Sequence, residues 1–101
     1  MKFGLSLDTI DKINGVFCRY PEIEQVIIYG SRAKGNYREG SDIDITLKGE
    51  NVNNNTLSKL KMEIDDLNTP YLFDISIFNT LVSNGLIQHI DRVGQILYTQ
   101  K

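Results

Sequence analysis

Hydrophobic positions recur with two different periods along this chain, and each change of period marks a new element. Apolar residues at helical spacing predict three helices, over roughly residues 7–19, 57–67 and 86–93. Ser6 stands just before the first of these segments, where a hydroxyl can cap the free backbone N–H groups of a helix. The sequence therefore predicts helices near its start, its middle and its end.

Strand patterns fill the spaces between the helices. Residues 26–29 form a continuous β-branched run that is typical of a buried strand, and it ends at Gly30. Residues 42–47 alternate strictly between polar and apolar, and residues 72–78 carry their polar side chains, Asp74 and Ser76, on alternate positions, which predicts two further strands. A short apolar run at residues 96–98 suggests a final strand, and the glycine-rich residues 31–40 predict a turn or short helix followed by a loop.

The alternation also predicts what each face of the sheet carries. Side chains two apart in a strand share a face, so Asp42, Asp44 and Thr46 lie opposite the isoleucines and leucine between them. Asp74 and Ser76 share a face of the third strand in the same way. We expect an α/β domain in which a small mixed sheet has one apolar and one polar face, with the three helices mainly on the apolar one.

Size and composition narrow the classes of protein. The 101 residues are enough for a single domain over 1–101, and the net charge of −2 disfavours bulk nucleic acid as a partner. Cys18 is the only cysteine, which rules out a disulfide within the chain and favours a reducing compartment. No apolar run is long enough to span a membrane, and no signal-peptide pattern follows Met1, so we expect a cytoplasmic protein.

The aspartates on the polar face are the first candidate chemistry. Aspartate is a poor strand former, yet Asp42 and Asp44 lie about 6.6 Å apart along one strand, from a rise of about 3.3 Å per residue. If the third strand pairs beside the second, Asp74 joins them, and like charges on neighbouring strands destabilise a sheet. A hard divalent cation such as Mg²⁺ offsets that repulsion, because it takes carboxylate oxygens as ligands.

The turn after the first strand is the second candidate. Gly30 and Ser31 lead into a predicted helical turn, and backbone N–H groups at such a turn attract anions. Gly30 allows a phosphate to approach the backbone closely, and Arg32 and Lys34 add positive charge. His89, on the third predicted helix, is interpreted instead as a surface or partly packed residue.

Together the two candidates form a recognisable pattern. Gly30-Ser31, ten intervening residues and then Asp42-Ile43-Asp44 resemble the Gly-Ser and Asp-x-Asp signature of the DNA polymerase β nucleotidyltransferase superfamily. The residues around these positions resemble its minimal nucleotidyltransferase branch, and the order of elements is similar over nearly the whole chain. One departure is Tyr29, where that family often has phenylalanine.

The resemblance implies a nucleotidyltransferase fold, an activity and a role for each site residue. Asp42 and Asp44 would bind two Mg²⁺ ions, Asp74 would complete the metal site and help to activate the acceptor hydroxyl, and Gly30 and Ser31 would hold the terminal phosphates. Arg32 is assigned to the nucleotide as well. The expected enzyme is a protein adenylyltransferase that uses ATP.

The resemblance also implies a partner. Minimal members of the family pair with a helical HEPN-type toxin and act as its antitoxin by adding AMP to a toxin tyrosine. Two alternatives stay open from the residues alone: a non-catalytic antitoxin that masks its partner, and nucleotidyl transfer to a small molecule such as an aminoglycoside. The sequence does not identify the base of the nucleotide or the acceptor.

Overall fold

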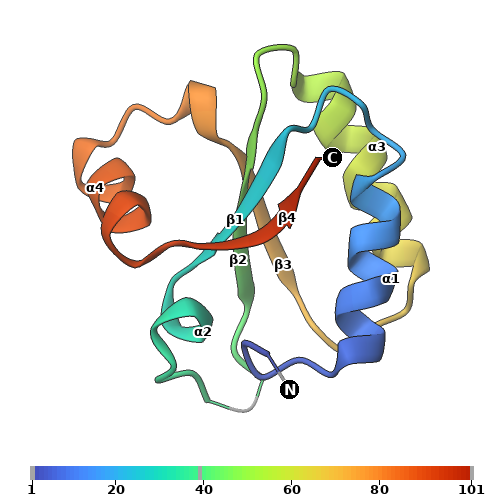
Figure 1. Cartoon of the computed structure of the whole chain (residues 1–101), viewed down its shortest axis with the longest axis vertical. Helices are drawn as coiled ribbons and strands as arrows, with labels where there is room; N and C mark the ends of the chain where they lie inside the picture. Colours follow the sequence, from blue (N-terminus) through green and yellow to red (C-terminus); the bar gives the residue numbers. More distant parts are fainter. Residues whose placement is uncertain (1, 39, 101) are drawn as a thin grey trace.

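The fold is a four-stranded mixed sheet flanked by helices, and this computed structural model describes residues 2–38 and 40–100. The elements follow one another as α1 (Leu7–Phe17), β1 (Gln25–Tyr29), α2 (Ser31–Lys34), β2 (Ile43–Lys48), α3 (Asn54–Asp66), β3 (Phe73–Ile77), a short 3₁₀ turn (Phe78–Thr80), α4 (Asn84–Val93) and β4 (Gln95–Thr99). Figure 1 shows the sheet between α1 and α3 on one side and α4 on the other. The predicted elements are all present, with ends that differ by up to three residues from the predicted ones.

The strands lie in the order β3-β2-β1-β4. β1 pairs antiparallel with both β2 and β4, whereas β2 and β3 are parallel. The parallel pair is possible because α3 provides the crossover connection between the two strands. This mixed α/β architecture confirms the predicted fold class.

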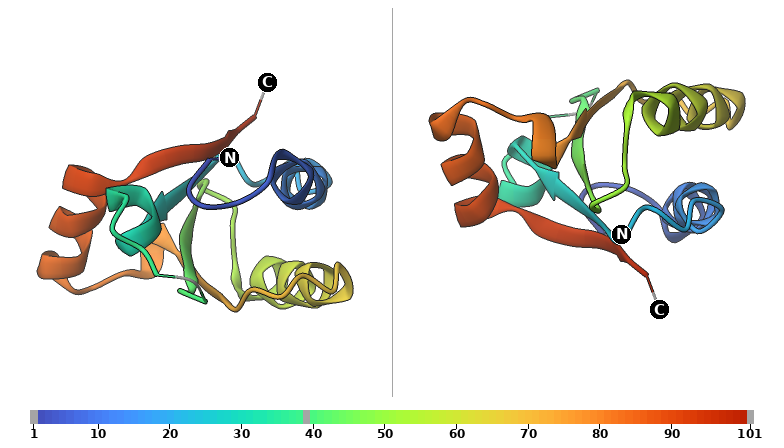
Figure 2. Two further views of the ribbon diagram at one scale, coloured as in Figure 1. Left: turned by 90° about the horizontal axis from the view of Figure 1, so that it is seen from below. Right: turned by 90° about the horizontal axis from the view of Figure 1, so that it is seen from above.

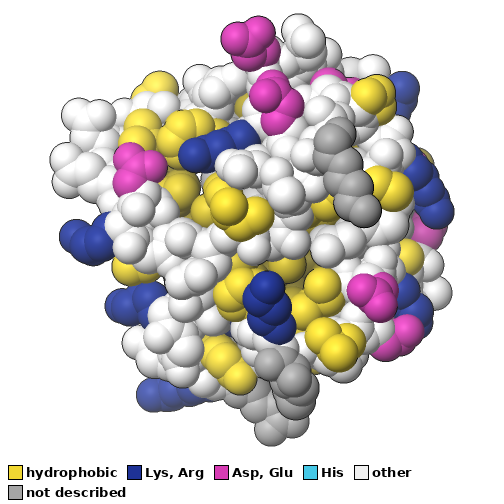
Figure 3. All heavy atoms as spheres, in the orientation of Figure 1, with side chains coloured by type: hydrophobic (Ala, Val, Ile, Leu, Met, Phe, Trp, Pro, Cys, Tyr) yellow, Lys and Arg dark blue, Asp and Glu magenta, His cyan; other side chains and the backbone are white. Residues whose placement is uncertain are grey.

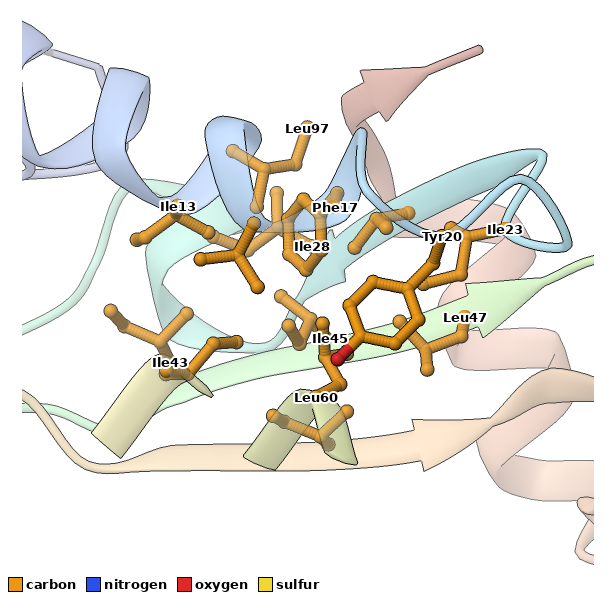
Figure 4. Packing of buried hydrophobic residues seen from close by; sticks show 14 of the residues in the cluster. Ile13, Phe17, Tyr20, Ile23, Ile28, Ile43, Ile45, Leu47, Leu60 and Leu97 are labelled. Atoms are coloured by element: carbon orange, nitrogen blue, oxygen red, sulfur yellow. The ribbon is translucent and has the colours of Figure 1, made fainter. Parts of the chain in front are cut away.

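The main core fills the space between the sheet, α1 and α3. Figure 4 shows Ile13 and Phe17 from α1 and Leu60 from α3 facing strand residues such as Ile28 and Ile45, and all five are fully buried. Ser6 caps α1 by accepting a hydrogen bond from the Thr9 N–H at 3.2 Å, as its position predicts. The alternating strands thus place every second side chain in this core, which fixes the opposite side chains on the other face.

The expectation that all three long helices cover the apolar face is wrong for α4. Ile90 of α4 packs on Ile27 and Tyr29, the two β1 side chains that point away from the main core. Figure 2 shows α4 on the opposite side of the sheet from α1 and α3 in both views. The physical reason lies in β1, whose last four residues are all buried and therefore need cover on both faces.

Two further features concern the length of the helices and the charge of the surface. Among the described residues, no helix is both long and apolar enough to cross a membrane. Lysine and arginine share the face seen in Figure 3 with aspartate and glutamate, so that face carries no broad field of a single sign. Hence the mixed surface agrees with the weak net charge of the chain, which is −2.

Candidate functional site

Two carboxylates meet on the polar face of the sheet. Asp44 of β2 and Asp74 of β3 are direct partners in the parallel register, so their side chains leave the sheet side by side. Asp74 is exposed and Asp44 is partly buried, while Asp42 is exposed and stands just before β2. Asp44 and Asp74 are thus brought together by strand pairing, as predicted, and Asp42 lies at the entrance to the same strand.

The pKa of Asp44 reflects the closeness of these carboxylates. Burial raises the pKa of the Asp44 carboxyl above its ordinary value, and the neighbouring charges of Asp74 and Asp42 raise it further. Burial, together with repulsion from the other two acids, therefore makes ionised Asp44 unfavourable in the protein without a counter-charge.

Metal binding can be tested against this arrangement. Within the described part of the chain, no three His, Cys, Asp or Glu side chains are grouped closely enough to hold a metal ion as they stand. The donor set nevertheless fits a hard divalent cation in kind, because all three groups are carboxylates and their repulsion is relieved by positive charge. A bound ion would draw the acids together, and Asp42 and Asp74 are exposed enough to turn toward it.

The glycine turn lies directly against Asp44. Gly30 follows β1 and has φ 75° and ψ −156°, a backbone conformation that is essentially restricted to glycine. A Cβ atom added at Gly30 would collide with the Asp44 carboxylate, since no other atoms separate the two residues. Ser31 then opens the single turn of α2, so the predicted phosphate-binding turn and the predicted metal-binding acid are immediate neighbours.

Arg32 lies in the turn beside Gly30 and Ser31, with its side chain buried in the protein. Its side chain is only 3% exposed, and its guanidinium donates hydrogen bonds to the carbonyl oxygens of Ser41 and Phe3. The rings of Tyr37 and Tyr71 lie 5.2 and 5.0 Å from the guanidinium carbon. A buried guanidinium held by backbone carbonyls has its donors committed to the protein, so this arrangement gives no support to the interpretation of Arg32 as a nucleotide ligand.

Two residues near the acids were not assigned to the site from sequence. Tyr29 is the register partner of Asp44, and the His89 ring meets the Tyr29 ring edge-on at 6.2 Å between centroids. His89 is close enough to Asp44 to lower the pKa of that carboxyl, against the larger effects that raise it. From the sequence, His89 was interpreted as a surface or partly packed residue, because a lone histidine on a helix is seldom a ligand.

The hydroxyl of Tyr29 belongs to the same polar cluster. Burial raises its pKa, the Ser76 side chain opposes that shift, and the charges of Asp74 and Asp44 add to it. The phenol is therefore held neutral, with a hydrogen available beside the two acids. Sequence reasoning gave Tyr29 no role because it lies in a strand that looks wholly apolar.

An open hollow at the opposite end of the sheet has no comparable chemistry. It measures about 440 Å³ and is lined by residues from the start of β1 and the ends of β2 and β4: Glu24, Gln25, Lys48, Gly49, Thr99 and Gln100. The acids and the glycine turn lie at the other ends of β1 and β2. The chemically distinctive site is thus the acid cluster rather than this hollow.

Solved structures with a similar fold give the first comparison. A toxin-antitoxin structure with AMP-PNP superposes with TM-score 0.71 at 20% identity, covering 96% of this chain and 76% of that one. The toxin-antitoxin MntA-HepT gives TM-score 0.67 at 18% identity, over 94% and 74% of the two chains. A tri-AMPylated Shewanella oneidensis HEPN toxin in complex with MNT antitoxin gives TM-score 0.64 at 19% identity, over 91% and 71%. At such identities the likeness establishes the fold.

The family is established by sequence. No curated protein matches the chain significantly. The family model described as Polymerase beta, Nucleotidyltransferase matches residues 11–101, which include the glycine turn and all three aspartates. The chain therefore belongs to the polymerase β nucleotidyltransferase family.

Proposed function

We propose that this protein is a Mg²⁺-dependent nucleotidyltransferase that moves AMP from ATP to a hydroxyl group. The observation that carries the proposal is the contact between Gly30 and Asp44, with Asp74 in register beside them. This contact puts a backbone that a phosphate can approach next to a pair of acids with the ligand chemistry of Mg²⁺. Membership of the nucleotidyltransferase family supports the same reaction.

The side chains divide the work by position. Gly30 and Ser31 hold the β- and γ-phosphates against the turn, and Asp42 and Asp44 would bind two Mg²⁺ ions, with Asp74 completing the site. When bound, these ions supply positive charge to the entering and leaving oxygens of the transfer. Asp74 is exposed, so an acceptor hydroxyl can reach it.

The reaction exchanges one phosphorus–oxygen bond for another. The acceptor oxygen forms a bond to the α-phosphorus, and the bond from that phosphorus to the bridging oxygen of pyrophosphate breaks. Asp74 orients the acceptor hydroxyl and receives its proton, which then passes to solvent. The phenol of Tyr29, whose pKa is raised by burial and by the charges of Asp74 and Asp44, stays neutral beside the acids.

The acceptor is a tyrosine of a HEPN-type helical toxin, and the protein acts as the antitoxin. Support comes from the structural neighbours, which include a toxin-antitoxin structure with AMP-PNP and an AMPylated HEPN toxin in complex with its MNT antitoxin. The mixed surface charge is consistent with a protein rather than a polynucleotide as the partner. All residues of the proposed site come from one chain, so the site does not require a second copy of the protein.

The decisive experiment follows the α-phosphate. ATP labelled at the α-phosphorus is incubated with Mg²⁺, the protein and the HEPN-type protein that co-purifies with it or is encoded beside it. We expect label on a partner tyrosine, and loss of that label in the Asp42→Asn/Asp44→Asn double variant. Asp65→Asn/Asp66→Asn is the matched control, because it changes the same number of acids on α3, away from the site.

The competing interpretations predict other results. Neutralisation of the partner by the double variant as well as by wild type, with no labelled product from any of the four nucleotides, would establish masking without catalysis. Label on an aminoglycoside, with none on the protein partner, would establish small-molecule transfer. Either outcome removes the protein-adenylylation proposal.

A further inference from the structure

Arg32 ties together the segments from which the site is built. Its guanidinium donates from Nε and Nη2 to the carbonyl oxygen of Ser41, at 3.1 and 2.9 Å, and from Nη1 to that of Phe3, at 2.9 Å. Tyr37 and Tyr71 place their rings against it. One side chain thus links α2 to the N-terminal turn, to the loop before β2 and to the segment before β3.

Each of these links is adjacent to a residue of the proposed site. Arg32 itself follows the Gly30-Ser31 turn directly, Ser41 immediately precedes Asp42, and Tyr71 comes three residues before Asp74. The loop before β2 is also closed on itself, because the Arg38 N–H donates to the Ser41 hydroxyl and the Ser41 N–H donates to the Arg38 carbonyl. The guanidinium is therefore the contact that holds this closed loop to the phosphate-binding turn.

The N-terminal turn is shaped to receive the same group. Phe3 and Gly4 both have positive φ, and Lys2 and Leu5 close the turn with two backbone hydrogen bonds. A Cβ atom on Gly4 would come within 2.9 Å of Arg32 Nη1 and within 2.6 Å of the Tyr37 ring. The turn, the guanidinium and the tyrosine ring are thus packed as one unit.

The geometry needs arginine rather than a cation in general. A planar guanidinium presents several N–H donors in a fixed fork, so it can bind two carbonyl oxygens from different segments and still stack on aromatic rings. A lysine ammonium at this position is a single point that cannot meet both oxygens in the same way. Substitution of Arg32 by lysine therefore keeps the positive charge but removes the hydrogen-bond geometry that joins the two segments.

We infer that Arg32 is a positioning residue of the nucleotidyl-transfer site, setting the distance between the Gly30-Ser31 turn and Asp42, an inference that rests on the proposed function. It acts through the Ser41 carbonyl and touches neither nucleotide nor metal. A displacement of reacting groups by about 1 Å is enough to reduce a rate by about 100-fold. The contacts of Arg32 thus prevent such a displacement across a loop whose described residues pair with no strand.

The test compares Arg32→Lys with Arg19→Ala, an arginine control whose side chain is exposed and pairs with Glu63 on the helical face of the molecule. For Arg32→Lys we expect kcat to fall roughly 10- to 100-fold while KM for ATP changes less than about threefold. The backbone amide NMR signals of Gly30, Ser31 and Asp42 shift in this variant, and more Mg²⁺ is needed to saturate their metal-induced changes. Arg19→Ala changes none of these quantities.

Two results with Arg32→Lys overturn the inference. The first is an Arg32→Lys variant with wild-type kcat and unshifted amide signals. The second is a rise of about tenfold in KM for ATP at constant kcat, which indicates direct contact with the nucleotide. If Arg32→Lys does not fold, Tyr37→Leu replaces it, because Tyr37 is 38% exposed and its ring can be removed without opening the core.

For Tyr37→Leu we expect a loss of roughly three- to tenfold in kcat, with shifts of the same three amides. Unchanged kcat and unchanged amides in that variant also overturn the inference. The NMR measurement separates the two proposals, since it reports the position of the turn and the loop without any turnover. Wild type that transfers no label would remove the proposed function, whereas the amide signals would still show whether Arg32 sets the turn against Asp42.

Discussion

The Cα of Gly30 lies directly against the carboxylate of Asp44, so that not even a methyl group fits between the two residues. The contact joins the end of β1 to the start of β2, on the polar face of the sheet. Because it depends on a backbone with positive φ, the contact exists only while residue 30 is glycine. This makes Gly30 the most sensitive position of the turn.

Gly30→Ala is expected to reduce nucleotidyl transfer by at least about 100-fold, because the added methyl group displaces Asp44. The strained backbone should also lower the free energy of unfolding by about 1–3 kcal/mol. Gly35→Ala is the matched control, since Gly35 also has positive φ but a Cβ there meets no atom within 4 Å. Transfer assays and urea unfolding of both variants check the prediction, and equal activities would contradict it.

Asp44→Asn should stabilise the metal-free protein while abolishing transfer. Because the pKa of Asp44 is raised in the folded protein, ionisation of this carboxyl opposes folding. The free energy of unfolding is therefore unaffected by this group below its ordinary pKa of 3.8, and it falls as the pH rises through the pKa of the folded state. At neutral pH we expect a gain of about 0.2–1 kcal/mol in the free energy of unfolding, from relief of repulsion across the strand pair.

Thermal unfolding in a chelating buffer, with Asp65→Asn as control, measures this gain. Added Mg²⁺ should raise the Tm of wild type and leave that of Asp44→Asn nearly unchanged. A metal-free Asp44→Asn protein that is less stable than wild type would show that the acids do not repel one another in the folded state.

Tyr20 is expected to make the protein sensitive to alkali. Burial, followed by its hydrogen bond to Glu63, raises the pKa of the Tyr20 hydroxyl to about 12. Because the pKa is raised in the folded state, the neutral Tyr20 hydroxyl contributes fully to the free energy of unfolding below its ordinary pKa of 10.0. This contribution is lost as the pH rises through about 12. Tyr20→Phe should lose about 1 kcal/mol at neutral pH and lack this alkaline decline.

Urea unfolding of wild type and Tyr20→Phe, between about pH 8 and about pH 12, tests the sign. The other tyrosines are common to both proteins, so the difference between the two curves isolates Tyr20. Parallel curves would mean that the hydroxyl of Tyr20 titrates alike in the folded and unfolded chains.

His89 should act on Asp44 through charge. The imidazole lowers the pKa of the Asp44 carboxyl, so its removal should move that pKa upward. His89→Phe keeps an aromatic ring against Tyr29 and removes only the ionisable group. Carbon NMR titration of the aspartate carboxyls measures the shift, and an unchanged Asp44 titration would exclude His89 from the site.

The sequence predicted the elements well because their periods are strong. The alternation in residues 42–47 and 72–78 also predicted which side chains share a face, and the register of Asp44 with Asp74 follows it. The side of the sheet that α4 covers was harder to infer. The apolar positions of this helix show which of its own faces is buried, but not which face of the sheet it packs on. The fully apolar run of β1 held that information, because burial on both faces requires a helix on each.

The contacts of Arg32 could not be predicted from the sequence. In the sequence it is one of several cations in a glycine-rich loop, and its place beside Gly30-Ser31 suggested contact with phosphate. Its actual partners are backbone carbonyls of residues 9 positions ahead and 29 positions behind. Backbone acceptors leave no trace in residue type, so only the three-dimensional structure reveals them.

The alternation of acids and isoleucines in β2 has a consequence for folding fidelity. Ile43, Ile45 and Leu47 are fully buried, whereas Asp44 between them belongs to the polar face. A slip of one residue in the pairing of β2 would carry Asp42 and Asp44 into the core and expel the three apolar side chains. The same acids that we assign to the reaction thereby also disfavour any pairing in which β2 is displaced by an odd number of residues.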